Sequence, residues 1–179
     1  MKKVVLTYGL IGGVMIACFV WLVSTMCDRN VISFDKSEYY GYGSMIVALT
    51  MVFFGIKSYR DNNGKGVITF WKGVQIGLLI TLIGVFMYFL AWTAYGRIHP
   101  EFLTKVTDKY AESQTKTMKA QGKSQEEIDK AIEEMRKMIE MFKNPILGFA
   151  ISAFEMGPVG IIVTLISAGL LRKRELLPA

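Results

Sequence analysis

The sequence predicts an all-α integral membrane protein, with four transmembrane helices and an extramembrane helical hairpin between the third and fourth. The chain has 179 residues, 52% of them hydrophobic, and a mean hydropathy of +0.35. Its apolar residues gather in four runs of about 20 residues, the length that a helix needs to cross a bilayer. A long polar segment with helix signals separates the last two runs. We therefore take residues 1–179 as one membrane domain. The predicted spans are residues 4–26, 39–56, 73–95 and 146–171.

The first span, residues 4–26, follows two lysines and superficially resembles a signal peptide. Its apolar run is longer than the roughly 7–15 residues of a signal-peptide core, so we expect an uncleaved helix. Gly9 and Gly13 place two small residues one helical turn apart, which permits close helix packing. Cys18 and Cys27 are the only cysteines in the sequence, which has one histidine. This content is too small for a disulfide framework or a clustered metal site, so we expect neither.

The second and third spans are linked by a short charged loop. The second span, residues 39–56, begins with a run of tyrosines, which is typical of the membrane interface. The third span, residues 73–95, starts with another pair of small residues, Gly73 and Gly77. Such pairs favour helix–helix packing, although ordinary small residues in a span explain them equally well.

The polar segment, residues 97–143, is predicted to form a helical hairpin outside the membrane. Ser124 and Glu127 make a capping box, in which each side chain accepts a hydrogen bond from the other residue's backbone N–H. Apolar residues then recur at spacings of four and three, as on one face of a helix. Gly122 separates this helix from an upstream one. The apolar positions are Ile128, Ile132, Met135, Ile139 and Phe142 on the second helix and Phe102, Val106 and Tyr110 on the first.

The charge of the hairpin limits what it can bind. It carries ten Lys or Arg against nine Asp or Glu. This mixture does not fit nucleic acid, because neutralising phosphates requires a face of one sign. The hairpin is therefore either an ordinary solvated surface or a docking surface for another protein.

The fourth span, residues 146–171, follows the helix-start pair Asn144-Pro145. Gly157 and Gly160 begin a series of small residues suited to tight helix packing. Pro158 lies between them and removes one backbone hydrogen bond, so we expect the helix to kink there.

Glu155 is the candidate for chemistry, because a carboxyl group inside a membrane span is expensive and needs a partner, a proton or a purpose. At 1.5 Å per residue, Glu155, Tyr88 and Ser44 lie at about the same depth, about 5 Å to the outer side of the bilayer centre. We therefore predict that these three side chains approach one another. Three roles remain open for Glu155: it locks helix packing through hydrogen bonds, it forms a proton or cation site in a small transporter, or it faces lipid or a partner.

The distribution of positive charge predicts the orientation, because Lys and Arg next to spans mark the cytoplasmic side. With four spans, both termini and the loop after the second span share one side. That side carries nine Lys or Arg against two acids. We predict a multi-pass membrane protein with both termini cytoplasmic and the hairpin on the opposite side of the membrane. The nine are Lys2, Lys3, Lys57, Arg60, Lys65, Lys72, Arg172, Lys173 and Arg174.

The sequence does not favour an enzyme, since it has no Ser/His/Asp set, no paired carboxylates in one span and no metal-ligand spacing. The single histidine, His99, stands at a helix junction. We expect no catalytic residue, cofactor or metal. The first hypothesis is a non-enzymatic membrane module that docks a partner or another copy through the hairpin and the small-residue helix faces. The alternative is a small proton- or cation-coupled transporter that uses Glu155.

Two segments resemble a known family. One is FGIKSYRDN at residues 54–62, followed by Gly66, Ile68, Phe70 and Lys72. The other is in the last span, with Asn144-Pro145, Glu155, Pro158, Gly160, Ser167-Ala168 and then Leu171-Arg172-Lys173. They resemble domain of unknown function number 4199, a family of small bacterial membrane proteins typical of the Bacteroidota. The resemblance covers nearly the whole chain, and it implies that the membrane is the bacterial inner membrane, with the hairpin in the periplasm. It implies four transmembrane helices with a helical excursion before the last, and it implies no activity.

Overall fold

Six helices make up almost all of the part of the chain that the structure, a computed structural model, describes: residues 1–32, 34–141 and 144–173. No strand is present in these residues beyond one isolated bridge. The predicted all-α fold class is confirmed. The helices are α1 (Lys2–Asp28), α2 (Phe34–Asn62), α3 (Phe70–Ile98), α4 (Pro100–Ala120), α5 (Gln125–Met141) and α6 (Pro145–Leu171).

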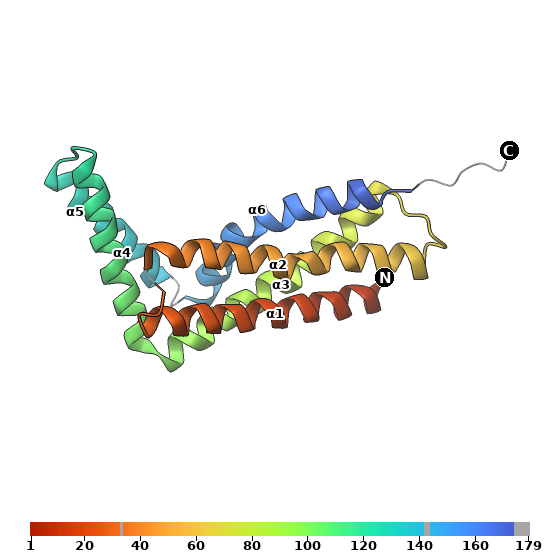
Figure 1. Cartoon of the computed structure of the whole chain (residues 1–179), viewed down its shortest axis with the longest axis horizontal. Helices are drawn as coiled ribbons and strands as arrows, with labels where there is room; N and C mark the ends of the chain where they lie inside the picture. The colour runs from red at the N-terminus through yellow and green to blue at the C-terminus, as the bar shows by residue number, and fades with distance from the viewer. Residues whose placement is uncertain (33, 142–143, 174–179) are drawn as a thin grey trace.

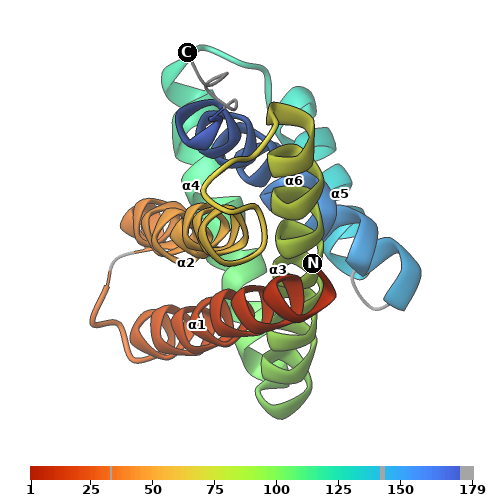
Figure 2. The same ribbon diagram turned by 90° about the vertical axis from the view of Figure 1, so that its right-hand side faces the viewer.

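Four of these helices, α1, α2, α3 and α6, lie along the long axis of the molecule, while α4 and α5 project from one end (Figure 1). The four long helices are each long and apolar enough to cross a membrane. The N-terminus, the α2–α3 loop and the end of α6 lie at the opposite end from α4 and α5 (Figure 1). Seen from that end, α3 stands between α1 and α6 (Figure 2).

The distribution of side chains in the four-helix bundle is the one expected when hydrocarbon is the solvent. Large apolar residues are exposed on its outside, including Leu82 at 55%, Ile162 at 57% and Leu170 at 74%. Hydroxyl-bearing residues are buried inside it. These are Ser24, Thr81, Ser152, Thr164 and Ser167. Together with the span lengths, this identifies a multi-pass membrane protein.

The helices extend beyond the apolar runs because hydrogen bonds, not hydropathy, determine where a helix ends. Thr69 is the N-cap of α3, and its side-chain oxygen accepts a hydrogen bond from the backbone N–H of Lys72 at 3.3 Å. The side-chain oxygen of Asn144 likewise caps α6, accepting from the backbone N–H of Ile146 at 3.0 Å.

Glycines bring α3 close to α1 on one side and to α6 on the other. A Cβ on Gly9 would lie 2.7 Å from Cδ1 of Ile83, and one on Gly77 would lie 2.6 Å from Cγ2 of Thr164. A Cβ on Gly160 would collide with Thr81. Two buried hydroxyl groups, those of Thr81 and Thr164, form a 3.5 Å hydrogen bond between α3 and α6. Such close approaches of small residues are how membrane helices associate.

Helices α4 and α5, which follow α3 and precede α6 in the sequence, pack against each other. The capping box is present: the Ser124 N–H donates to Oε2 of Glu127 at 3.0 Å, and the Glu127 N–H donates to Oγ of Ser124 at 3.3 Å. The Ser124 N–H and the neighbouring Lys123 hold the pKa of the Glu127 carboxyl below its usual value. Gly122 follows α4 with a φ of +74°, a left-handed conformation that glycine adopts without strain. Phe142 and the side chains of Val106, Tyr110 and Ile139 lie outside the described part.

Helix α4 is attached to the end of the bundle by the aromatic ring of Phe102 and by two polar contacts. The ring of Phe102, 3% exposed, lies 5.0 Å from that of Tyr95, centroid to centroid. Nζ of Lys105 lies 2.8 Å from Oδ1 of Asp28, and Nζ of Lys109 donates to Oδ1 of Asn30 at 2.7 Å. These contacts connect the hairpin to the α1–α2 end of the bundle.

Candidate functional site

Glu155 lies on α6 at the border between the buried and the outward face of that helix. Its neighbour Met156 is 1% exposed and packs into the bundle, whereas Phe154 is 83% exposed and points outward. Glu155 itself is exposed on the side of the bundle. Its position follows from the helical period, since the buried residues of α6 recur at Ser152, Met156 and Gly160, four residues apart.

Tyr88 of α3 is the polar side chain on the inner side of Glu155. It is 5% exposed, and its hydroxyl lies within hydrogen-bonding reach of the Glu155 carboxyl group and of the Trp92 side chain. The rings of Tyr88 and Trp92 are T-shaped, with centroids 6.5 Å apart. Tyr42 of α2 lies within electrostatic range of Tyr88. We call Glu155, Tyr88, Trp92 and Tyr42 the Glu155 cluster. Three of the four long helices contribute to it.

Ser44, the third residue of the predicted polar group, uses its hydroxyl within its own helix. The hydroxyl donates its hydrogen to the carbonyl oxygen of Gly41, about one turn earlier in α2, in a hydrogen bond of 2.7 Å. Its approach to Glu155 stays a prediction. Tyr42 is the residue of α2 that sequence reasoning missed. Positions two residues apart along a helix differ by only about 3 Å in depth, so an estimate of depth does not distinguish Tyr42 from Ser44.

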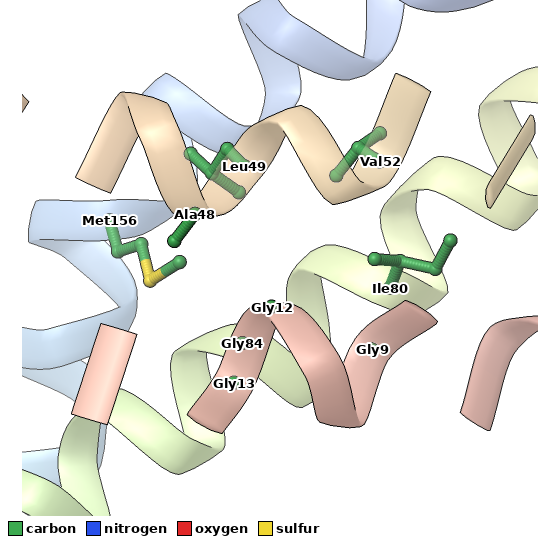
Figure 3. A pocket seen from close by; sticks show the side chains of 9 residues that line it. All are labelled: Gly9, Gly12, Gly13, Ala48, Leu49, Val52, Ile80, Gly84 and Met156. Carbon is green, nitrogen blue, oxygen red and sulfur yellow. The ribbon is translucent and has the colours of Figure 1, made fainter. Parts of the chain in front are cut away.

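The small cavity at the centre of the bundle is lined by glycines and apolar side chains, and Glu155 is not among its lining residues. A cavity of about 10 Å³ lies where α1, α2, α3 and α6 meet (Figure 3). Its walls are three glycines of α1, together with Ala48, Leu49, Val52, Ile80, Gly84 and Met156. A space of this size without polar partners does not hold an ordered water. Glu155 therefore faces the side of the bundle.

The predicted small-residue pairs are already occupied by contacts within the chain. Gly9 and Gly13 face α3, and Gly73 and Gly77 face α6. Gly157 is different, because a Cβ built there meets no atom within 4 Å. Docking through the two pairs would require the bundle to open, whereas the surface at Gly157 is accessible.

The other residues considered in the sequence analysis are His99, the two cysteines and Pro158, and none of them belongs to the Glu155 cluster. His99 ends α3 and precedes α4, and its ring lies 4.7 Å from that of Tyr95. Cys18 is exposed and Cys27 buried, and both are free thiols. Pro158 lies inside α6, which is continuous from Pro145 to Leu171, and its kink stays a prediction. In the described residues no group of three or more His, Cys, Asp or Glu could hold a metal ion.

Comparison with known proteins identifies one family. A family described as "Protein of unknown function (DUF4199)" matches residues 7–173, nearly the whole chain. Neither the curated proteins nor the solved structures contain a match.

Proposed function

The chain belongs to the DUF4199 family of proteins of unknown function, so we infer its activity from its own residues. We propose that it is a non-enzymatic membrane module. It docks a helix of a partner membrane protein on the face around Glu155. The exposure of Glu155 on the side of the bundle is the observation that supports this most. The pairs Gly9–Gly13 and Gly73–Gly77 are used inside the chain, so the docking surface lies elsewhere.

The position of Glu155 makes an uncovered face unfavourable. It stands near the middle of α6, where the surrounding bilayer is hydrocarbon. A charged side chain at the centre of a membrane helix costs about 3 kcal/mol, because hydrocarbon neither solvates it nor offers hydrogen bonds. Tyr88 is buried and lies on the inner side of the carboxyl group, whereas Glu155 itself is exposed. A helix packed on the outer side would remove the remaining exposure.

The chemistry of the partner follows from charge. In the sequence, Glu155 is the only Asp, Glu, Lys or Arg within the four predicted spans. A second copy of the chain therefore brings another carboxyl group to this depth and no cation. The complementary partner is a transmembrane helix with a Lys or Arg at the depth of Glu155. The open surface at Gly157 allows the backbone of such a helix to approach closely.

The hairpin is a second candidate contact for the same partner, outside the membrane. An open groove of about 630 Å³ lies along its helices, and the lining side chains carry charges of both signs. A mixed lining suits a protein surface better than a polyanion. Its walls include Asp108, Glu112, Lys116, Lys119 and Arg136.

A small proton- or cation-coupled transporter remains the second candidate function. The proximity of the Tyr88 hydroxyl to the Glu155 carboxyl group favours it, because ionisable groups within spans mark ion and proton pathways. In a transporter, Glu155→Gln would abolish substrate uptake in proteoliposomes that contain this chain alone. A docking module shows no uptake to lose.

The orientation that we propose is an inner-membrane protein with cytoplasmic termini and a periplasmic hairpin. Eight of the nine predicted cytoplasmic cations are in the described residues, on helix ends and loops away from the hairpin (Figure 1). Arg174 lies outside the described part. A reporter fused after Ala179 is expected to be active only in a form that works in the cytoplasm. Activity of a periplasm-specific reporter there would reverse the orientation.

Glu155→Gln tests the docking proposal. From native membranes in mild detergent, the wild-type chain is expected to co-purify with a membrane protein that carries a basic residue in a span. The variant is expected to retain that protein about tenfold less well or worse, because it leaves the partner's charge buried and unpaired. Glu101→Gln, which removes an exposed carboxylate on α4, is the matched control. Equal recovery with Glu155→Gln and wild type, at equal stability, contradicts the proposal.

A further inference from the structure

At the end of the bundle that carries the termini, backbone hydrogen bonds fix the α2–α3 loop against the end of α6. The Ile68 N–H donates to the Lys173 carbonyl oxygen and the Lys173 N–H donates to that of Ile68, both at 3.1 Å. The Gly66 N–H of the loop donates to the carbonyl oxygen of Arg60, near the end of α2, at 3.0 Å. Ile68 is 4% exposed and packs into the core. The charged residues around this loop are therefore held on an ordered support.

The charge at this end is strongly positive. Arg60 is 2.7 Å from Asp61, and Lys57 and Lys173 both lie within electrostatic range of the same carboxylate. Residues distant in sequence thus meet here, since α2 and the segment after α6 both contribute. The described residues at this end belong to the end of α2, the loop, the start of α3 and the end of α6. Together they carry six Lys or Arg and one acid, Asp61. The six, which we call the basic end, are Lys57, Arg60, Lys65, Lys72, Arg172 and Lys173.

Large apolar side chains accompany the basic end on the outside of the bundle. Trp71 precedes Lys72 and is 73% exposed, and Leu170 precedes the Arg172–Lys173 pair and is 74% exposed. Exposed tryptophan is typical of the level of the lipid headgroups, and exposed leucine is typical of the acyl-chain region. A ligand that fits both features has an anionic head and a hydrocarbon tail.

We propose that the basic end binds the phosphate headgroup of an anionic phospholipid, with Lys57, Arg172 and Lys173 as its principal contacts. Clusters of Lys and Arg directly beside a span attract anionic headgroups, because the cations lie at the height of the phosphates. These three side chains are all exposed. The proposal is independent of the docking face, which lies on the side of the bundle, and it holds for either orientation in the membrane.

The triple variant Lys57→Ala, Arg172→Ala and Lys173→Ala tests this site. Native mass spectrometry of the detergent-solubilised chain, titrated with phosphatidylglycerol, measures lipid binding. Each cation contributes about fivefold, so the triple variant is expected to bind about a hundredfold more weakly. Phosphatidylcholine binding is expected to stay unchanged. The matched control removes three exposed cations from the hairpin, Lys116, Lys119 and Lys130, and is expected to bind phosphatidylglycerol like the wild type.

Two further variants keep the test valid if the triple variant folds poorly. Lys57→Arg with Lys173→Arg preserves the charge and is expected to preserve binding. Asp61→Asn removes the acid that pairs with Arg60 and is expected to strengthen binding a few fold, since it increases the positive potential.

Three results would overturn the proposal. One is equal preference of the wild type for phosphatidylglycerol and phosphatidylcholine. Another is an equal loss of binding in the hairpin control, which would indicate a non-specific charge effect. The third is full displacement of the lipid by glycerol phosphate at a concentration equal to that of the lipid, which would identify a site for a soluble phosphate instead.

Discussion

Replacing Phe102 by alanine is expected to detach the hairpin from the bundle while the four long helices stay folded. Phe102 is 3% exposed, and its ring stacks on that of Trp92 as well as contacting Tyr95, with centroids 6.5 Å and 5.0 Å away. Truncating a buried phenylalanine costs about 3 kcal/mol or more, since the removed contacts leave a cavity. That corresponds to about a hundredfold more hairpin in the detached state.

Hydrogen exchange of the detergent-solubilised protein measures this effect. Amides of α4 and α5 are expected to exchange faster in Phe102→Ala, whereas those of α3 and α6 keep their protection. Phe54→Ala is the matched control, because it removes the same ring from a side chain that is 45% exposed. If Phe102→Ala leaves exchange in α4 and α5 at the wild-type rate, the aromatic contact does not attach the hairpin.

The second large effect is expected from Gly160→Ala, which inserts one methyl group between α6 and α3. A Cβ at this position collides with the side chain of Thr81, whose hydroxyl is hydrogen-bonded to Thr164. Overpacking of this kind destabilises by about 1–3 kcal/mol. The midpoint of thermal unfolding in detergent is expected to fall accordingly.

Gly157→Ala provides the comparison within the same helix. Nothing lies within 4 Å of a Cβ at Gly157, so the new methyl group meets no obstacle. Alanine in place of glycine inside a helix stabilises it by about 0.5–1 kcal/mol, so the midpoint is expected to stay the same or rise. Equal unfolding midpoints of the two variants would show that α3 and α6 do not meet through Gly160.

The spans could be predicted from the sequence because the length and hydropathy of a run decide whether it can cross a bilayer. Helix ends were less predictable, because they depend on caps. α3 starts at Phe70, before its apolar run, since Thr69 caps it there. The capping box of Ser124 and Glu127 was predictable because it is local in sequence and needs no tertiary contact.

The depth of the site residues in the bilayer was predictable from the sequence, but the rotation of each helix about its own axis was not. Rise per residue places Glu155 and Tyr88 at a similar level, and the structure brings them within hydrogen-bonding reach. Which face of each helix points inward depends on how the helices pack. Met156 occupies the inward position next to Glu155, so the carboxyl group lies at the exposed border and Gly157 stays open. No pattern along α6 alone fixes that rotation, since small residues are spread over more than one of its faces.

If a partner helix docks on the face around Glu155, Glu155 lies on a lateral face of the bundle that meets lipid when no partner is bound. A spin label attached to a Phe154→Cys variant, with Cys18 and Cys27 replaced by serine, measures this in proteoliposomes of the chain alone. Phe154 is 83% exposed beside Glu155, whereas Ser152 on the buried face is 0% exposed, so Ser152→Cys supplies the reference position for the label. The label at position 154 is expected to collide far more with oxygen, which dissolves in the bilayer, than with a water-soluble nickel chelate. A label at position 152 is expected to collide with neither. Preferential collision with the nickel chelate at position 154, or a label there as shielded as the one at position 152, would contradict the docking proposal.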